Sequence, residues 1–383
     1  MTVLRTDWLE DPDTQHVCKV LKDGGADVYF VGGCVRNALL GAGASDLDLC
    51  TNMRPERVID VAEAAGIRAI PTGIDHGTVT LVHKSVPYEI TTFRRDVATD
   101  GRRAVVAFSD CIKEDAARRD FTMNALYARP DGEVVDPLDG LPDLVARRVR
   151  FIGTAENRIR EDYLRSLRYF RFHAWYGNAD LGFDPDALSA IAGNLDGIPS
   201  LSRERVGQEL VKLLAAPDPA PAIAVMRQIG LLSVILPGSD DRALAPLIHL
   251  EAGMPPDPMR RLAALGGEDP REALRLSKAQ ANMVQLLRTE ATGSTAPAAL
   301  AYMYDQSVAR DAMLLRSALL EMPLPPMLET ELNAGAQAVF PLTAQDLMPD
   351  LRGPALGAAL KRLKSDWIAS GFSLDKDSLL KRL

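Results

Sequence analysis

Val28-Tyr-Phe-Val-Gly-Gly-Cys-Val-Arg-Asn-Ala-Leu-Leu40 organises the N-terminal part of this chain. Its first four residues are apolar strand formers, Gly32-Gly33 marks a tight turn, and the stretch 35–40 reads as a helix that ends at Gly41. A glycine turn that opens a helix leaves backbone N–H groups and the positive end of the helix dipole available to a phosphate. The segment therefore predicts a phosphate cradle, with an ordinary glycine turn and a surface Arg36 as the alternative.

The residues after this stretch continue the mixture of strands and helices. A short strand is expected at 47–49, a helix at 55–65, and two strands at 77–83 and 87–93 that form a hairpin about Lys84-Ser85. From Ala155 onward strand signals are few, and apolar residues recur at the three- and four-residue spacing of helices. The pattern predicts an α+β protein whose remainder is mostly helical.

Length and composition restrict the class of protein. With 383 residues the chain exceeds the usual size of one hydrophobic core, so we expect two or more structural units. Its 47% apolar and 25% charged residues are typical of a soluble globular protein. No apolar run is long enough to span a membrane and the N-terminal residues are charged, so neither secretion nor a membrane partner is expected.

Cysteine usage and net charge add two further expectations. The four cysteines contain no CxxC pair, which argues against a zinc site or a disulfide framework and predicts a cytoplasmic protein. A net charge of -8 gives no global support for nucleic-acid binding, so any such surface must be local. Nothing in the sequence predicts a protein partner.

Asp46-Leu-Asp48 is the first candidate catalytic group. Residues two apart on a strand project to the same face, so the two carboxylates are expected side by side with Leu47 turned inward. Mg²⁺ takes oxygen ligands and substrate phosphates, which suits such a pair, although a surface turn is the alternative. Glu89, on a later predicted strand, is expected to complete a three-carboxylate site unless it is only an exposed strand residue.

Six stretches together resemble the ordered motifs of the class II CCA-adding enzymes, the tRNA nucleotidyltransferases and poly(A) polymerases of the polymerase beta-like superfamily. Asn37 stands where the family usually has aspartate, which weakens any role for a charge there. The stretches are Val31–Asn37, Asp46–Asp48, Gly73–Thr78, Glu89–Arg94, Arg118–Ala125 and Glu161–Arg165.

The resemblance implies an architecture and an activity. It implies a mixed-sheet nucleotidyltransferase head at 1–150, a helical neck at 151–235 that recognises the nucleotide base, and a helical body and tail at 236–383 that bind tRNA. Family members add C, C and A to the 3′ end of tRNA from CTP and ATP without a template, and pyrophosphate leaves. We expect a Mg²⁺-dependent two-metal phosphoryl transfer in which Asp46 and Asp48 hold the metal and Glu89 assists.

Asp162 and Arg165 are the expected base-reading pair. Cytosine and adenine present an amino donor beside a ring-nitrogen acceptor, so a carboxylate and a guanidinium together would accept both and reject uracil and guanine. The two residues are three apart on a predicted helix, about 60° around its axis, and would face one base edge. A helix-surface ion network with Glu161 is the alternative.

Other arginines are candidates for the triphosphate. We expect Gly32, Gly33 and Arg36 to position the phosphates, and the resemblance favours Arg119 for the same role. Arg168 and Arg171 are expected to hold the triphosphate, neighbouring RNA or acidic partners of their own helix, and the resemblance implies nucleotide-binding roles for both. The alternative for Arg119 is a helix start capped by Asp120. From 142 to 176 there are 8 arginines against 4 acids, a local basic patch. The aromatic residues interleaved with it are expected to be mostly core: Tyr163, Tyr169, Phe170, Phe172 and Trp175.

Two neighbouring segments complete the expectations. The polar stretch 94–117 reads as a long loop, and in the family a flexible segment here is needed for the switch from CTP to ATP, which favours complete CCA addition. A helix capped by Ser202 carries Arg203 and Glu209, which are either solvent-exposed or support the nucleotide pocket. The remaining alternatives are a poly(A) polymerase, a CC-adding enzyme and a non-catalytic tRNA-binding protein.

Overall fold

The protein has two compact units. The computed structural model describes residues 2–43, 46–100, 103–348 and 350–383, and the units are Met1–Ile235 and Leu236–Leu383. Unit 1 contains all the described strands and a set of helices, whereas unit 2 is helical, which confirms the α+β fold class. The boundary expected at residue 150 and the roles of the three segments stay predictions.

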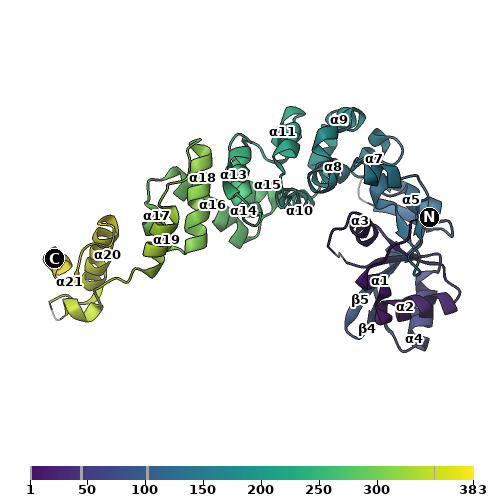
Figure 1. Ribbon diagram of the computed structural model, residues 1–383, viewed down its shortest axis with the longest axis horizontal. Coiled ribbons are helices and arrows are strands. Elements are labelled where there is room, and N and C mark those ends of the chain that lie inside the picture. Colours follow the sequence, from purple (N-terminus) through teal and green to yellow (C-terminus); the bar gives the residue numbers. More distant parts are fainter. Residues whose placement is uncertain (1, 44–45, 101–102, 349) are drawn as a thin grey trace. The chain divides into compact units, whose positions relative to one another are not determined.

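A mixed seven-stranded sheet organises the first half of unit 1 (Figure 1). Its order is β3-β4-β5-β2-β1-β8-β9; β2 and β5 run parallel, and the other paired strands are antiparallel. The strands are β1 (Val28–Val31), β2 (Asp48–Thr51), β3 (Arg68–Gly73), β4 (Thr78–His83), β5 (Val86–Thr92), β8 (Tyr127–Ala128) and β9 (Val134–Val135).

Local patterns placed most of the first elements correctly. Helix α3 (Gly33–Leu39) follows β1 but begins at Gly33, two residues before its expected start. The hairpin between β4 and β5 turns at Lys84 and Ser85, which both have positive φ. Helix α4 (Pro55–Ala64) contacts β3, β4 and α2 (Pro12–Asp23), and β3 itself was not expected from the sequence. A four-residue helix, α1 (Asp7–Glu10), precedes α2.

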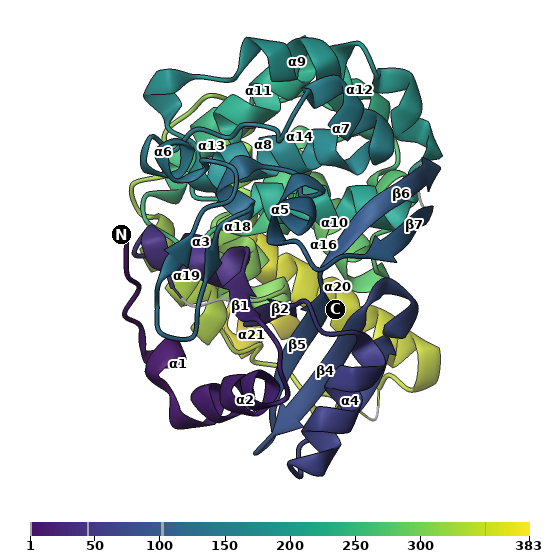
Figure 2. The ribbon, with the colours of Figure 1, turned by 90° about the vertical axis from the view of Figure 1, so that its right-hand side faces the viewer.

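The segment 94–117 is not the long loop that its polarity suggested. It forms the hairpin β6 (Arg94–Asp100) and β7 (Arg103–Phe108), followed by helix α5 (Ile112–Ala117) beside it (Figure 2). Residues 101–102 of this expected loop lie outside the described residues. The strands pair with each other in a separate two-stranded sheet, so polar composition did not reveal the local pairing.

The rest of unit 1 is helical. Helix α8 (Leu164–Tyr176) packs against α10 (Arg203–Leu214), α11 (Ala220–Gln228) and α7 (Ala155–Glu161), and Ser202 caps α10 as expected. Thr122–Asn124 is only a 3-10 turn preceded by Phe121, so Asp120 does not start an α-helix there. The remaining helices are α6 (Leu141–Val145), α9 (Pro185–Ala192) and α12 (Leu231–Ile235).

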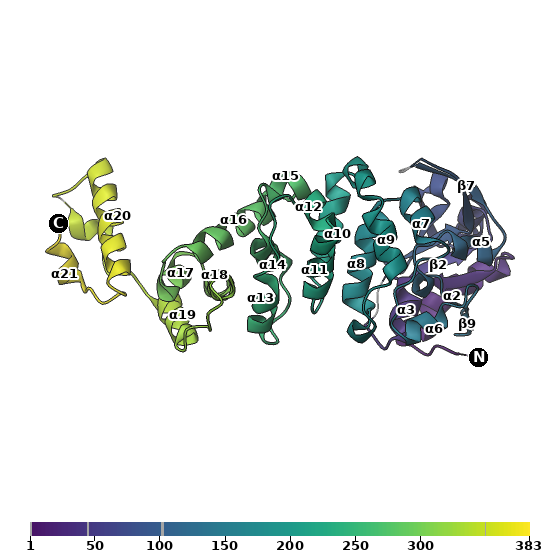
Figure 3. The same cartoon turned by 90° about the horizontal axis from the view of Figure 1, so that it is seen from above.

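Unit 2 consists of helices that pack against one another, with a separate hydrophobic cluster near the C-terminus (Figure 3). The buried Trp367 and Leu363 belong to that cluster. None of the helices within the described residues is both long and apolar enough to cross a bilayer. The helices are α13 (Leu244–Glu251), α14 (Pro258–Leu265), α15 (Pro270–Leu274), α16 (Lys278–Thr292), α17 (Pro297–Met303), α18 (Gln306–Leu319), α19 (Leu328–Gln337), α20 (Gly353–Ala369) and α21 (Lys376–Leu380).

Candidate active site

Acidic side chains meet where β2 and β5 run in parallel. Asp48 is the first residue of β2 and lies opposite Glu89 of β5 in the sheet register. Asp46 precedes the strand, so only Asp48 of the expected pair lies on β2, and the same-face arrangement of the two carboxylates stays a prediction. Burial, together with the charges of Glu89 and Asp46, nevertheless raises the pKa of Asp48 to about 6, although Arg119 opposes this.

The two aspartates fit a hard divalent cation. Neighbouring carboxylates repel one another, and a cation that binds among their oxygens stabilises their ionised forms. Within the described residues no group of three or more histidine, cysteine or acidic side chains lies close enough together to hold a metal ion. The part expected of Glu89 in a three-carboxylate site stays a prediction. The fit to Mg²⁺ therefore rests on Asp46 and Asp48, with Glu89 as their charged neighbour.

The glycine turn adjoins Arg119. Gly32 precedes α3 with φ of 74°, a conformation that residues with a Cβ rarely adopt. A Cβ built on Gly32 would lie 3.6 Å from Nη1 of Arg119, so the guanidinium lies against the turn. The structure thus brings Gly32, Gly33 and Arg119 together at the start of α3.

Arg119 is held by a buried carboxylate that the sequence analysis missed. Asp115 accepts from Nη2 of Arg119 at 3.0 Å, from Nε of Arg118 at 2.9 Å and from the Tyr127 hydroxyl at 2.8 Å. Burial alone would raise the pKa of Asp115, but Arg119 and Arg118 outweigh it and hold that pKa below its usual value. The available signal was the spacing, because Asp115 on α5 stands three and four residues before the two arginines that follow the helix.

Arg36 is buried rather than a surface arginine. It is 6% exposed, and its Nη1 donates to Oδ1 of Asn124 at 2.5 Å. Its Nη2 donates to Oδ1 of Asn37 at 3.0 Å and to the Tyr176 hydroxyl at 2.9 Å, and burial lowers the pKa of the guanidinium. Arg36 therefore joins α3 to α8, and Asn37 takes part in this contact through its amide.

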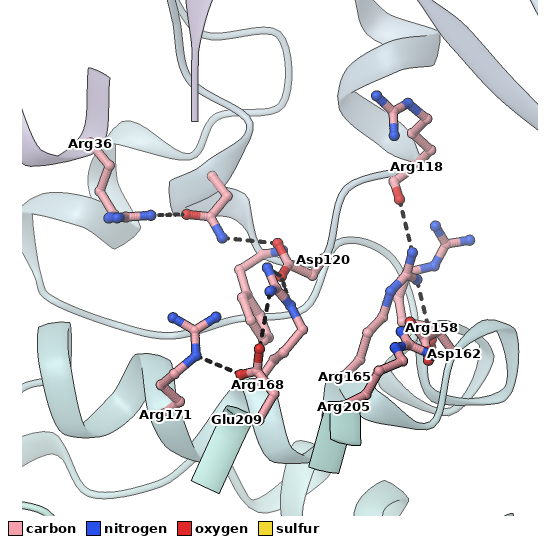
Figure 4. A network of polar contacts seen from close by, with 12 residues as sticks. Arg36, Arg118, Asp120, Arg158, Asp162, Arg165, Arg168, Arg171, Arg205 and Glu209 are labelled. Carbon is pink, nitrogen blue, oxygen red and sulfur yellow. Dashed lines mark hydrogen bonds and ion pairs between the residues drawn. The ribbon is translucent and has the colours of Figure 1, made fainter. Parts of the chain in front are cut away.

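A polar network continues from Arg36 through the segment around Asp120 to helices α8 and α10 (Figure 4). Asn124 donates to Oδ1 of Asp120 at 2.9 Å, and Arg168 donates to Oδ2 from Nε at 2.8 Å and from Nη2 at 2.5 Å. Burial favours a higher pKa for Asp120, but Arg168 and Asn124 outweigh it and lower that pKa. Glu209 of α10 accepts from Nε of Arg171 at 2.5 Å and lies 3.8 Å from Nη1 of Arg168.

Asp162 and Arg165 lie close together but not on one helix. Helix α7 ends at Glu161, Asp162 is extended, and α8 begins at Leu164, so the expected 60° separation around a shared axis is wrong. Asp162 accepts from the backbone N of Leu164 at 3.1 Å through Oδ1, which explains why the chain breaks here: an aspartate favours a helix start over a helix interior. The backbone N of Arg165 donates to the carbonyl of Asp162 at 2.9 Å.

Separate partners restrain the two side chains. Arg165 donates to Glu161 at 2.6 Å and to the carbonyls of Arg158 and Arg118 at 3.2 and 3.0 Å. The ion pair with Glu161 that the spacing allowed is thus present. Oδ2 of Asp162 accepts from Nη2 of Arg205 at 2.6 Å, a contact that no local sequence signal revealed because the residues are 43 positions apart.

The basic patch of 142–176 is largely neutralised by ion pairs. Arginines 150, 158, 160, 165, 168 and 171 each lie within ion-pair distance of a carboxylate. The counting of charges within one stretch missed this because Asp120 and Glu209 lie outside it. Tyr169, Phe170 and Phe172 are buried, which confirms that most of the interleaved aromatic residues are core, whereas Trp175 is 41% exposed.

Comparison with known proteins defines the class first. The family model described as "Poly A polymerase head domain" matches residues 28–150, and "Probable RNA and SrmB- binding site of polymerase A" matches residues 180–242. The acidic pair, glycine turn and arginines all lie in or next to these matches. Fold and site therefore define a nucleotidyltransferase, a class of enzyme that generally depends on a divalent metal.

Individual relatives identify the family. CCA tRNA nucleotidyltransferase 1, mitochondrial, of Mus musculus is 33% identical over 373 residues, which cover 92% of this chain and 86% of the relative. The CCA-adding enzyme of Geobacillus stearothermophilus is 39% identical over 226 residues, 58% of this chain and 54% of the relative. The crystal structure of the Bacillus stearothermophilus CCA-adding enzyme in complex with CTP has a TM-score of 0.78 and 28% identity, covering 97% of this chain and 96% of that chain. The chain belongs to the CCA tRNA nucleotidyltransferase family, as the motifs indicated.

Proposed function

We propose that this protein completes the 3′ end of tRNA by adding C, C and A from CTP and ATP, with release of pyrophosphate at each addition. The observation that carries the proposal is the relationship over 92% of the chain to an enzyme named for this reaction. The roles of individual residues are supported by their positions at the start of β2, at the glycine turn and at the junction of α7 and α8.

The acidic residues bind the metal and orient the tRNA end. Asp46 and Asp48 would hold Mg²⁺, and Glu89, opposite Asp48, adds negative charge that favours a cation there. When bound, Mg²⁺ supplies Lewis-acid activation of the terminal 3′-hydroxyl and charge neutralisation for the triphosphate. The pKa of Asp48 is raised to about 6 because its negative charge is disfavoured at this position. A bound cation would stabilise that charge.

The turn at Gly32-Gly33 and the guanidinium of Arg119 bind the triphosphate. The amides at the start of α3 donate to phosphate oxygens, and Arg119 stabilises the charge that develops on departing pyrophosphate. Arg36 supports the phosphate site indirectly, because its hydrogen bonds to Asn124 and Tyr176 hold α3 against α8. This is a narrower role than the direct phosphate contact expected from the sequence.

Asp162 and Arg165 read the incoming base. The carboxylate accepts from the exocyclic amino group of cytosine or adenine, and the guanidinium donates to the adjacent ring nitrogen. Uracil and guanine would leave both protein groups without partners, which disfavours these bases once the nucleotide shields the two groups from water. Arg168 and Arg171 also lie on α8, where they are ion-paired with Asp120 and Glu209. They bind the nucleotide beside Arg165.

One assay separates this function from its alternatives. The protein is incubated with Mg²⁺, CTP and ATP and a tRNA that lacks CCA, and the product is sequenced. Addition that stops at CCA supports the proposal. A long adenine tail would identify a poly(A) polymerase, a product ending in CC a CC-adding enzyme, and no addition a tRNA-binding protein without catalysis.

Two further assignments belong to this proposal. The helices of residues 236–383 bind tRNA, which a gel-shift comparison of full tRNA with an acceptor minihelix tests. The protein works in the cytoplasm, an assignment supported by its four unpaired cysteines and tested by cell fractionation. The relative of Mus musculus is named as mitochondrial, so the mitochondrion is the alternative outcome.

A further inference from the structure

We propose that Arg205 is a positioning residue that sets nucleotide choice by fixing the carboxylate of Asp162. The inference rests on the proposed function, in which Asp162 accepts a hydrogen bond from the base. Arg205 lies on α10, outside the stretch that contains the base-reading pair, and its Nη2 lies 2.6 Å from Oδ2 of Asp162. Both side chains are about one-third exposed, so the pair borders an accessible space rather than the core.

The position of Arg205 is determined by its helix. Ser202 caps α10, with its hydroxyl 3.5 Å from the backbone N of Arg205, so Arg205 lies in the first turn. Glu209 is four residues further on and therefore shares a helix face with Arg205. Because Glu209 is ion-paired with Arg171 of α8, this face of α10 is anchored at a second point. Arg205 thus approaches Asp162 from a fixed backbone.

The remaining hydrogen-bonding capacity of Asp162 matches its proposed task. Each carboxylate oxygen can accept two hydrogen bonds. Oδ1 accepts one from the backbone N of Leu164, and Oδ2 accepts one from Arg205, so one position on each oxygen stays available for an amino group. With both oxygens restrained, the carboxylate cannot turn aside to accommodate a base that presents a carbonyl instead. Loss of Arg205 would remove one of the two restraints.

The guanidinium half of the base reader does not depend on Arg205. Arg165 is held by Glu161 and by the carbonyls of Arg158 and Arg118. A change at residue 205 therefore loosens the acceptor and leaves the donor in place. This asymmetry predicts weaker discrimination between bases rather than a general loss of transfer.

The experiment compares Arg205→Met and Arg205→Lys with Asp162→Ala and a matched control. Lys212→Met serves as the control, because Lys212 is an exposed cation on the same helix. Steady-state kcat and KM are measured for CTP and UTP on tRNA lacking CCA, and for ATP and GTP on tRNA ending in CC. For Arg205→Met we expect the kcat/KM preference for CTP over UTP, and for ATP over GTP, to fall about tenfold or more, with most of the change in the KM of the correct nucleotide. Lysine should restore part of the preference, since it keeps the charge but not the planar fork.

Three results would overturn the inference. One is a wild-type preference in Arg205→Met while Asp162→Ala loses it, which leaves the proposed base reading intact. A second is an equal loss of kcat with all four nucleotides, which indicates a purely structural role. The third is an unchanged preference in Asp162→Ala, which removes the base-reading assignment itself. Thermal unfolding accompanies each variant, and Arg205→Gln replaces the methionine variant if the latter does not fold.

Discussion

Asp48 at the start of β2 lies directly opposite Glu89 of β5, because these two strands run parallel in one register. Helix α4 and strands β3 and β4 separate the two strands in sequence, and β5 then pairs with β2 inside the sheet and supplies a second carboxylate. Burial and this neighbour together raise the pKa of Asp48 to about 6. The acidic site is therefore a product of sheet topology rather than of the Asp46-Leu47-Asp48 stretch alone.

The first prediction concerns Asp48. Replacement by asparagine keeps the shape but removes the charge, and it should lower kcat for both CTP and ATP addition by a factor of about 10³ or more. Nucleotide binding should persist, because the glycine turn and Arg119 are untouched. Single-turnover kinetics and equilibrium binding of CTP measure the two effects, and Glu63→Gln, at an exposed position of α4, is the control. Full turnover by Asp48→Asn would contradict the metal assignment.

A second prediction uses the glycine turn. Gly32 has φ of 74°, so Gly32→Ala should destabilise the protein by about 1–3 kcal/mol and raise KM for CTP and ATP alike. Gly43 offers the comparison, since it lacks a positive φ and a Cβ there would meet no atom within 4 Å. Gly43→Ala should change stability by less than about 0.5 kcal/mol. Equal effects of the two substitutions in chemical denaturation and kinetics would argue against a strained phosphate cradle at Gly32.

The sequence was informative where contacts are local. The turn at Lys84-Ser85, the Ser202 cap and the succession of β1, glycine turn and α3 each depend on neighbouring residues, and each was expected correctly. Asp162 was a local signal for a helix break, but the periodicity of the surrounding residues favoured one continuous helix in the sequence analysis. In the structure the capping tendency of aspartate outweighs that periodicity, and the helix is interrupted.

Contacts between distant segments were beyond this kind of reasoning. The partners of Arg168 and Asp162 are 48 and 43 positions away, in Asp120 and Arg205, and nothing in a local pattern selects them. The hairpin β6–β7 was missed for a related reason. Its strand residues are charged as well as apolar, and only their pairing with each other distinguishes them from a loop.

The third prediction tests the support of Arg119. Asp115 is buried and bonded to Arg118, Arg119 and Tyr127, so Asp115→Asn should cost about 3 kcal/mol of unfolding free energy, because two cations lose their charged partner. Tyr127→Phe keeps the ring but removes the hydrogen bond that the hydroxyl donates to Asp115 and the one that it accepts from Nε of Arg119, and it should cost about 2 kcal/mol. Urea denaturation measures both costs. A double variant whose cost equals the sum of the single costs would show that Tyr127 and Asp115 do not act together.

The last prediction concerns the pH dependence of stability. His173 on α8 stacks on Phe183 with ring centroids 3.7 Å apart, and its Nε2 lies 2.9 Å from the carbonyl of Gly182. Burial lowers the pKa of His173 in the folded state, although that carbonyl opposes the shift. The unfolded chain, with an ordinary histidine pKa of about 6.5, then binds the proton more tightly than the folded chain. The contribution of His173 to stability is therefore present above about pH 6.5 and is lost as the pH falls toward the lower pKa of the folded state.

His173→Phe keeps an aromatic ring against Phe183 but cannot titrate, so its unfolding free energy should fall less between pH 7.5 and pH 5.5 than that of the wild type. Denaturant titrations at both pH values, with His173→Gln as a second non-titrating variant, measure the difference, and parallel losses in all three proteins would exclude His173 as a source of acid sensitivity.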